Sequence, residues 1–274
     1  MKRQITDIKE IQKLELDILL SLIKYFEENS IQYFSYAGTT IGSVRHKGFI
    51  PWDDDVDLLI PRADYERLLE ISDGKLIDGY IEIKKPGDRD YIYPYSKACN
   101  VNTVIYEKNV TDKKYATGIF VDLFPFDNLS NSALKNKLLF IRIAFLRSML
   151  ETASDQVNLS KKGSVRYILK QIARTLQKPA AKLIGVERLA KKLNSYGKKQ
   201  LKIKSDYIGD IYFYDTYSKK YFETASKGDF EGYEINNPVG WHEYLTQAYG
   251  DYMTPPPEDK RGGHAFEAWY TDKE

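Results

Sequence analysis

The chain has 274 residues, of which 42% are hydrophobic, and it carries a net charge of +2 at pH 7. This length and apolar content can bury the core of one large domain, or of one domain with a helical insertion, and we favour the second layout. The single cysteine, Cys99, excludes an intramolecular disulfide. The longest apolar stretch, around residues 138–146, is short and contains Arg142. We therefore predict no membrane span or secretory signal and expect a cytoplasmic protein, at most peripheral at the inner face of the cell membrane.

The first predicted element is a helix over residues 5–29, where apolar residues recur at helical spacing. Strand and helix signals then alternate from residue 31 to residue 128, which predicts a mixed sheet against which the helix packs. The strands of this sheet are expected near Tyr33, Val56, Ile81, Val104 and Val121.

A glycine corner follows the first expected strand. The aromatic-rich strand pattern of residues 33–37 breaks at Gly38 into a short helical pattern. Glycine permits close backbone approach there, and the N–H groups at a helix start attract anions. We therefore expect these N–H groups, with the hydroxyls of Thr39 and Thr40, to face the phosphates of a substrate.

An acidic run, Asp53-Asp54-Asp55-Val56-Asp57, leads into the next apolar strand. Side chains alternate faces along a strand, so Asp55 and Asp57 project from the same face. Two carboxylates on one face suit a hard cation, Mg²⁺ or Mn²⁺, which neutralises and orients phosphate oxygens. The alternative is a solvated acidic turn, and Asp53 is not assigned as a ligand because it could merely shape that turn.

A third carboxylate is expected at the same place. Residues 117–126 form an apolar strand pattern with a single charged residue, Asp122. A lone buried carboxylate normally pairs or coordinates metal, so Asp122 is our candidate third ligand beside Asp55 and Asp57. A salt bridge or a strand-end cap is the alternative.

Beyond residue 128 the pattern changes to long helices, over residues 133–151 and 164–203, with Pro179 and Gly185 interrupting the second. The change predicts a helical subdomain. The expected division is a catalytic core with an N-terminal helix (1–128), a basic helical subdomain (129–206) and a C-terminal segment that returns to the active site (207–274).

The charge of the helical subdomain is uneven. Residues 161–204 contain 14 lysines and arginines and one acidic residue, Glu187, a formal charge of +13, so the rest of the chain carries −11 against the total of +2. An anionic membrane surface fits this segment best. In the alternative, the apolar residues form the subdomain core and the lysines are its solvated face. Nucleic acid is not expected as a partner, because the acidic remainder of the chain would repel it. The apolar residues in question are Ile168, Leu169, Ile172, Leu176, Leu183, Ile184 and Leu189.

The order of the glycine corner, the acidic pair at 55–57 and Asp122 resembles the pattern of the nucleotidyltransferase fold. Residues 37–57 are similar to the signature of the LicD family of phosphotransferases, which fukutin-related proteins share. Residues 249–264 resemble that family's carboxy-terminal segment. The resemblance implies an α+β fold, with a nucleotidyltransferase-like mixed β-sheet core, flanking helices and a helical insertion subdomain.

The resemblance also implies a reaction. A phospho-alcohol, most familiarly phosphocholine, is transferred from a CDP-linked donor to a hydroxyl of a cell-surface glycan or its lipid-linked precursor, and CMP is released. Asp55, Asp57 and Asp122 match the family's metal-binding carboxylates, and Gly38 with Thr39 match its glycine corner. Some fukutin-related members hold zinc through cysteines, which one cysteine cannot do, so we predict no zinc.

Phosphoryl-type transfer asks mainly for positioning and charge neutralisation, and Asp122 is the first candidate for the general base. Trp52 could stack on a base or a choline-type cation, or could simply pack the acidic loop. Five residues are candidate cations for the leaving CMP, although each could instead serve the structure, as a clamp on the acidic loop, a strand-surface lysine or a solvated tail. They are Arg45, His46, Lys97, Arg261 and His264.

Two other functions stay open. A true nucleotidyltransferase would carry the same acidic residues but transfer a nucleoside monophosphate from a triphosphate. A non-catalytic glycan-assembly protein could use the same fold, although it would have no chemical need to keep three carboxylates together. The glycine-rich segment 226–238 is expected to be a loop that binds acceptor or connects elements.

Overall fold

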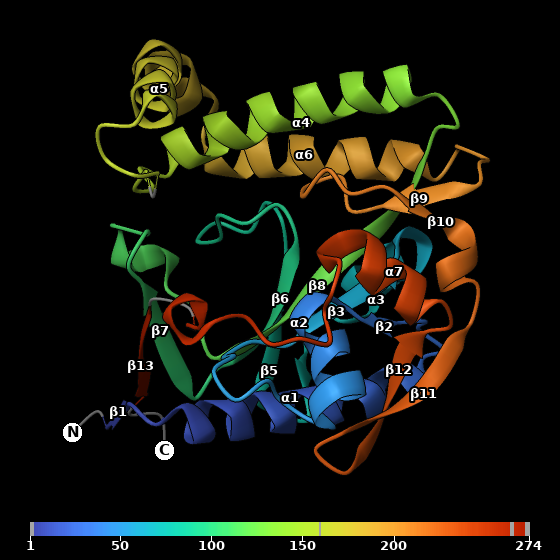
Figure 1. Ribbon diagram of the computed structural model, residues 1–274. Helices are drawn as coiled ribbons and strands as arrows, with labels where there is room; N and C mark the ends of the chain where they lie inside the picture. The colour runs from blue at the N-terminus through green and yellow to red at the C-terminus, as the bar shows by residue number, and fades with distance from the viewer. Residues whose placement is uncertain (1–2, 159, 264–265, 272–274) are drawn as a thin grey trace.

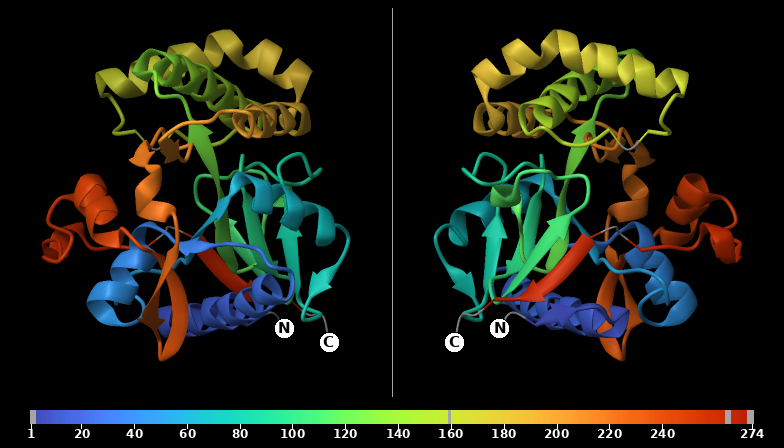
Figure 2. Two further views of the ribbon diagram at one scale, coloured as in Figure 1. Left: turned by 90° about the vertical axis from the view of Figure 1, so that its right-hand side faces the viewer. Right: turned by 90° about the vertical axis from the view of Figure 1, so that its left-hand side faces the viewer.

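The computed structural model describes residues 3–158, 160–263 and 266–271. A central mixed sheet lies between helix α1 (Ile8–Glu28) on one side and a layer of three helices on the other (Figure 1). These helices are α4 (Ala133–Ala153), α5 (Val165–Ile184) and α6 (Val186–Gln200). Figure 2 shows the same arrangement from two further sides. No helix in the described ranges combines the length and the apolar character needed to cross a bilayer.

The central sheet is organised around its longest strand, β8 (Phe120–Leu129), which is buried along nearly its whole length. Its first half pairs in parallel with β3 (Asp57–Pro61) and antiparallel with β6 (Ser96–Asn100), and its last residues pair with β9 (Tyr207–Gly209). The sheet also contains β2 (Phe34–Ser35), β4 (Leu76–Ile77), β5 (Ile81–Lys84) and β10 (Tyr217–Ser218).

Two small sheets flank this core. One contains β1 (Gln4–Ile5), β13 (Phe266–Tyr270) and β7 (Thr103–Glu107), and the other is the hairpin of β11 (Ala225–Phe230) and β12 (Tyr233–Pro238). The remaining helices are α2 (Ala37–Ile41), which continues into a π-helical turn (Gly42–His46), α3 (Arg62–Ile71) and α7 (Trp241–Tyr249).

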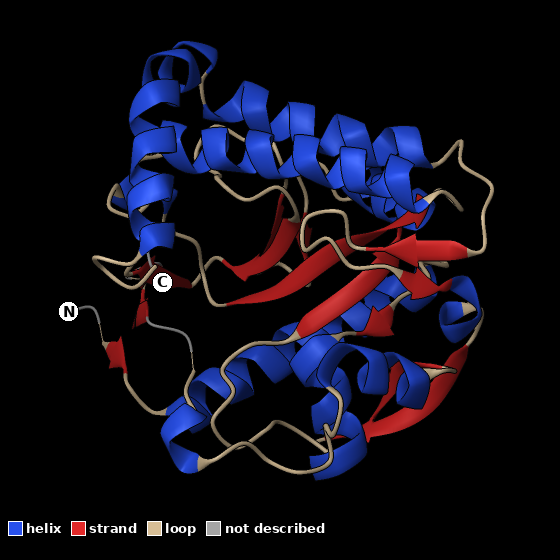
Figure 3. Ribbon diagram, turned by 45° about the horizontal axis from the view of Figure 1, so that its top comes forward, coloured by secondary structure: helices blue, strands red, loops and turns tan. Residues whose placement is uncertain are grey.

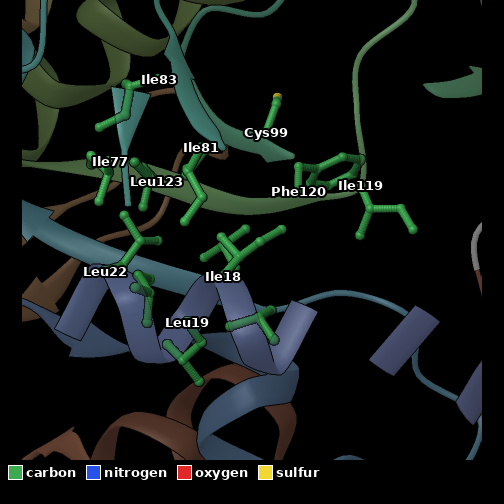
Figure 4. Packing of buried hydrophobic residues seen from close by; sticks show 14 of the residues in the cluster. Ile18, Leu19, Leu22, Ile77, Ile81, Ile83, Cys99, Ile119, Phe120 and Leu123 are labelled. Carbon is green, nitrogen blue, oxygen red and sulfur yellow. The ribbon is translucent and has the colours of Figure 1, made fainter. Parts of the chain in front are cut away.

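Helix α1 covers one face of the central sheet. It begins where the Asp7 side chain accepts a hydrogen bond from the Lys9 N–H at 2.9 Å, an N-cap that satisfies a free backbone donor. Its fully buried residues Ile18 and Leu22 pack against β5 and β8 (Figure 4). Full burial of such side chains contributes roughly 1.5–3 kcal/mol each, so this face anchors the core.

The α+β class and the mixed sheet expected from the sequence are confirmed. Three local predictions are wrong. The strand at Val104 belongs to the separate sheet of β7 and β13, a pairing between distant parts of the chain that no local pattern reveals. Pro179 does not interrupt α5, because it lies on the exposed side, where water can solvate the carbonyl group that loses its partner. Residues 226–238 form most of a hairpin rather than a loop.

A buried ion pair joins the helical layer to the sheet. The Arg62 guanidinium at the start of α3 donates to both carboxylate oxygens of Asp127 on β8, each at 2.7 Å, and to the side-chain oxygen of Asn194 on α6, also at 2.7 Å. Gly197 on α6 leaves room for this guanidinium, because a Cβ there would lie 2.1 Å from Arg62 Nη2. Figure 3 shows how the three helices lie across this end of the sheet.

The substitution Asp127→Asn should lower the free energy of unfolding by about 3 kcal/mol, because the buried Arg62 charge loses its two-oxygen partner and keeps only the partly exposed Glu66, 3.3 Å away, among the acidic residues that pair with it in the described chain. Urea denaturation measures the change. The control is Asp73→Asn, which breaks the exposed ion pair between Asp73 and Lys85 and should cost less than about 1 kcal/mol. Equal losses in the two variants would contradict the role given to Arg62.

Candidate active site

Three charged side chains lie in one row across neighbouring strands of the central sheet. Asp57 on β3 is directly opposite Asp122 on β8, and Asp122 is directly opposite Lys97 on β6. Residues at matched positions of paired strands project from the same face, so the row brings these side chains together. The Lys97 ammonium lies 2.8 Å from Asp122 Oδ1 and 3.2 Å from the centroid of the Phe120 ring.

The row carries more negative than positive charge. Burial raises the pKa of Asp57 well above its usual range, and repulsion from Asp55, Asp122 and Asp53 raises it further. Burial also raises the pKa of Asp122, to about 6, against the opposing pull of Lys97. Lys97 is 2% exposed, so it is a buried partner of Asp122 and not a strand-surface lysine. Of the two carboxylates in the row, Asp122 is therefore the one that Lys97 neutralises, and the charge of Asp57 is offset less.

A divalent cation fits this donor set. Hard cations take carboxylate oxygens, and two buried carboxylates that repel each other are stabilised by an ion between them. Within the described ranges, no group of three or more histidine, cysteine, aspartate or glutamate side chains is placed to hold a metal. Mg²⁺ commonly uses one or two carboxylates and takes its other ligands from water and substrate phosphates, so a site of that kind would need no more than Asp57 and Asp122 from the protein.

The glycine corner holds the acidic loop in place. A Cβ on Gly38 would lie 2.5 Å from Asp53 Oδ2, so the loop requires glycine at that position. The Thr39 hydroxyl accepts a hydrogen bond from the Asp57 N–H at 2.8 Å, and the Thr40 hydroxyl lies 2.9 Å from that of Ser35. Both threonines are buried. The corner thus fixes the start of β3, a role in addition to the phosphate contact expected from the sequence.

Helix α1 supports the same loop from below, through two polar residues that the sequence analysis missed. The Gln12 amide donates to the Asp53 carbonyl at 2.7 Å. Glu15 is 2% exposed, and burial followed by repulsion from Asp55 raises its pKa well above the usual range. Their position in the sequence could have identified them. Gln12 and Glu15 lie on the apolar face of the amphipathic helix α1, where a polar side chain needs a specific partner.

The C-terminal segment reaches the acidic loop from more than 200 positions away. Arg261 lies over the Trp52 ring, with 4.6 Å between its Cζ and the ring centroid, and a Cβ on Gly263 would lie 2.5 Å from Asp54 Oδ2. Arg45 donates to His46 Nε2 at 2.9 Å and to the carbonyl of Tyr252. His264 lies outside the described residues.

His46 is also drawn into this group, because its ring meets the Trp52 ring edge-on at 6.4 Å between centroids. The candidate residues therefore fall into two places. Asp57, Asp122 and Lys97 form the row inside the sheet. Arg45, His46, Trp52 and Arg261 form a cluster around the acidic loop.

A cavity of about 290 Å³ lies beside the row, between the sheet and the helical layer. Its wall includes the rings of Tyr93, Tyr95 and Phe213, and the Tyr93 ring centroid is 4.7 Å from the Lys97 ammonium. The Tyr93 hydroxyl donates to Glu107 Oε1 at 2.5 Å. The sequence analysis did not identify this cavity, although the run Tyr91-Ile92-Tyr93-Pro94-Tyr95 is an aromatic signal that could have pointed to it.

Comparison with known proteins identifies the family. Residues 30–145 match the family described as LicD/FKTN/FKRP, nucleotidyltransferase domain. The chain is 30% identical over 264 residues to the lipopolysaccharide cholinephosphotransferase LicD of Haemophilus influenzae, an alignment that covers 92% of this chain and 95% of that protein. The chain belongs to the LicD family.

Shorter matches connect this LicD-family chain with two uncharacterized rickettsial proteins. It is 46% identical over 44 residues to one from Rickettsia prowazekii, 16% of each chain. It is 49% identical over 37 residues to one from Rickettsia typhi, which covers 14% of this chain and 12% of that protein. The family match includes the glycine corner, the acidic loop and the row of Asp57, Asp122 and Lys97, so the site lies within the nucleotidyltransferase domain of the family.

The substitution Asp57→Asn should stabilise the metal-free protein at pH 8. Because the folded state raises the pKa of Asp57, folding favours the protonated form, and the wild type loses stability as the pH rises through that raised value. Asparagine cannot ionise, so the variant does not lose folding stability in this way as the pH rises. Thermal denaturation between pH 4 and pH 8 should therefore show a gap between variant and wild type that widens with pH.

The matched control is Asp90→Asn, which removes one negative charge from an exposed position. Addition of MgCl₂ should stabilise the wild type and the control but not Asp57→Asn. A variant that is less stable than the wild type at pH 8, or a gap that does not change with pH, would show that Asp57 is not held under electrostatic repulsion.

Proposed function

We propose that this LicD-family protein is a Mg²⁺-dependent transferase that moves phosphocholine from CDP-choline to a hydroxyl of a cell-surface glycan or its lipid-linked precursor. The observation that carries the proposal is the row of Asp57, Asp122 and Lys97, in which the part-buried Asp57 and the buried Asp122 lie at matched positions of two parallel strands. The similarity to a lipopolysaccharide cholinephosphotransferase over nearly the whole chain supports the reaction class.

The chemistry assigned to these residues is substitution at the phosphorus that bears choline. The acceptor hydroxyl oxygen forms a new bond to that phosphorus, while the phosphorus–oxygen bond to CMP breaks and its electron pair leaves with CMP. The hydroxyl proton passes to the Asp122 carboxylate.

A Mg²⁺ ion held by Asp57 and Asp122, with Asp55 as a further carboxylate whose charge acts on Asp57, would neutralise the negative charge of the donor diphosphate. Arg261 lies at the acidic loop with about a third of its side chain exposed, and we assign it to the cytidine monophosphate half of the donor. Lys97 is buried against Asp122 and positions that carboxylate.

The cavity beside the row favours choline over other alcohols. Aromatic rings attract a quaternary ammonium through their electron-rich faces, and Tyr93, Tyr95 and Phe213 supply three rings there, with the Glu107 carboxylate nearby. Protein cations already lie over two of these rings, Lys97 4.7 Å from the Tyr93 centroid and Arg147 5.5 Å from the Phe213 centroid, so choline would share them. Other charges on the wall are already engaged. Lys170 and Glu151 form an ion pair at 2.9 Å, and Arg147 donates to the carbonyl of Tyr212.

Calorimetric titration should show binding of CDP-choline that requires Mg²⁺, with CDP-ribitol and CTP bound more weakly. Asp57→Asn should lower both this binding and the release of CMP at least about 100-fold, since loss of groups that only support a metal ligand already costs 10–100-fold. Asp90→Asn serves as the control. Preference for CTP would favour the nucleotidyltransferase alternative, and failure to bind any of the nucleotides would favour a binding-only protein.

The substitution Tyr93→Leu should weaken CDP-choline binding by about tenfold and leave CDP-glycerol binding unchanged, because one cation–π contact contributes about 0.5–2 kcal/mol. Tyr93→Phe is the matched control, since it keeps the ring and removes only the hydrogen bond to Glu107. An equal loss for both donors in Tyr93→Leu would show that the ring supports the site as a whole and does not recognise choline.

A further inference from the structure

Helix α5 packs against the rest of the protein with its polar face and exposes its apolar face to solvent, the reverse of an ordinary surface helix. Surface helices normally bury their apolar stripe and expose their polar one. In α5 the large apolar residues are exposed, with Leu169 at 61%, Ile172 at 52% and Leu176 at 79%, and Ala181 is the helix's one buried residue. The large apolar residues of this helix therefore lie outside the subdomain core, which includes Ala181 of α5 together with Leu189 and Leu193 of α6.

The polar side of α5 makes the contacts with the rest of the protein. Arg174 pairs with Glu151 of α4 at 2.9 Å and donates to the carbonyl of Gln156 at 2.7 Å. The Gln177 amide donates to the hydroxyls of Ser148 and Thr152, at 2.6 and 3.0 Å. Such contacts fix which face of the helix points outward, so the exposure of the apolar stripe is built into the packing.

Helix α4 continues the apolar surface. Leu134, Leu138, Ile141 and Phe145 recur at helical spacing along one side of its first turns, and each is 47–66% exposed. Ser148 and Thr152, which contact α5, continue the same side toward the end of the helix. Helix α5 thus lies on the outer side of α4, and in Figure 1 α4 slopes so that its beginning rises toward the level of α5.

Basic residues border both stripes. Lys161, Lys162 and Arg166 are exposed at the beginning of α5, and Lys137 and Arg142 are exposed on either side of the α4 stripe. An exposed apolar stripe flanked by lysine and arginine is the pattern of helices that lie in the plane of an anionic bilayer, with the apolar side among the acyl chains.

We propose that the outer faces of α4 and α5 form a surface that docks on an anionic lipid bilayer. The surface consists of the apolar stripes of the two helices and their basic border. A cavity of about 540 Å³ beside the α4 stripe, lined mainly by apolar atoms around Phe140, Ile141 and Tyr214, provides further space for an acyl chain. This interaction is separate from donor binding and does not require it.

Co-sedimentation with vesicles tests the proposal. The full chain should bind vesicles that contain phosphatidylglycerol and should bind vesicles of pure phosphatidylcholine several-fold more weakly. The triple substitution Leu169→Ser, Ile172→Ser and Leu176→Ser should lower the bound fraction at least about tenfold, because it removes apolar area that would enter the bilayer. These side chains are exposed, so circular dichroism should show an unchanged fold.

The matched control replaces three exposed apolar residues elsewhere, Leu76→Ser, Tyr233→Ser and Val239→Ser, and should bind vesicles like the wild type. Binding of CDP-choline should be the same in all three proteins, which keeps this test independent of the proposed reaction. Equal vesicle binding by the two triple variants would overturn the proposal. The proposal would also be overturned if the wild type did not bind vesicles but formed a dimer, and the α5 triple variant were a monomer. The α5 surface would then bind a second copy of the chain.

Discussion

Two aspartates, the part-buried Asp57 and the buried Asp122, lie at matched positions on adjacent parallel strands, and the free-energy cost of ionising both at once shapes the site around them. Lys97, from the strand on the other side, offsets one charge. A cation between two neighbouring carboxylates lowers the repulsion between them. A divalent ion that also binds phosphate would in this way help to bind the substrate. We therefore place the proposed chemistry at the row that the pairing of β3, β8 and β6 brings together.

Contacts from three different parts of the chain fix the position of the acidic loop relative to this row. Gly38 gives the Asp53 carboxylate room, Thr39 accepts from the Asp57 N–H, and Gln12 on α1 binds the loop backbone. Arg261 returns from the end of the chain to lie on Trp52. A site assembled in this way from residues distant in sequence, on rigid elements, can hold a diphosphate in one orientation, which is the main requirement of phosphoryl transfer.

Local patterns predicted the parts of this structure that depend on local rules. The spacing of apolar residues predicted α1, and apolar strand patterns placed Asp57 and Asp122 in strands of the sheet. Asp55 was expected on the same strand as Asp57, but β3 begins only at Asp57, so Asp55 lies in the loop before it. Patterns could not show that Lys97 is buried, because that depends on which strands become its neighbours. They could not place Glu15 and Gln12 beneath the acidic loop for the same reason. The stripe of α5 was visible, but only its contacts with Glu151, Ser148 and Thr152 show that the stripe faces outward.

The most direct test of the central claim is a crystal structure with Mn²⁺ and CMP, in which anomalous scattering locates the metal independently of any assumption about the site. We expect a manganese peak with carboxylate oxygens of Asp57 and Asp122 as ligands and the CMP phosphate beside it. Manganese bound elsewhere, with Asp57 and Asp122 uncoordinated, would contradict the view that this pair of strands forms the catalytic centre.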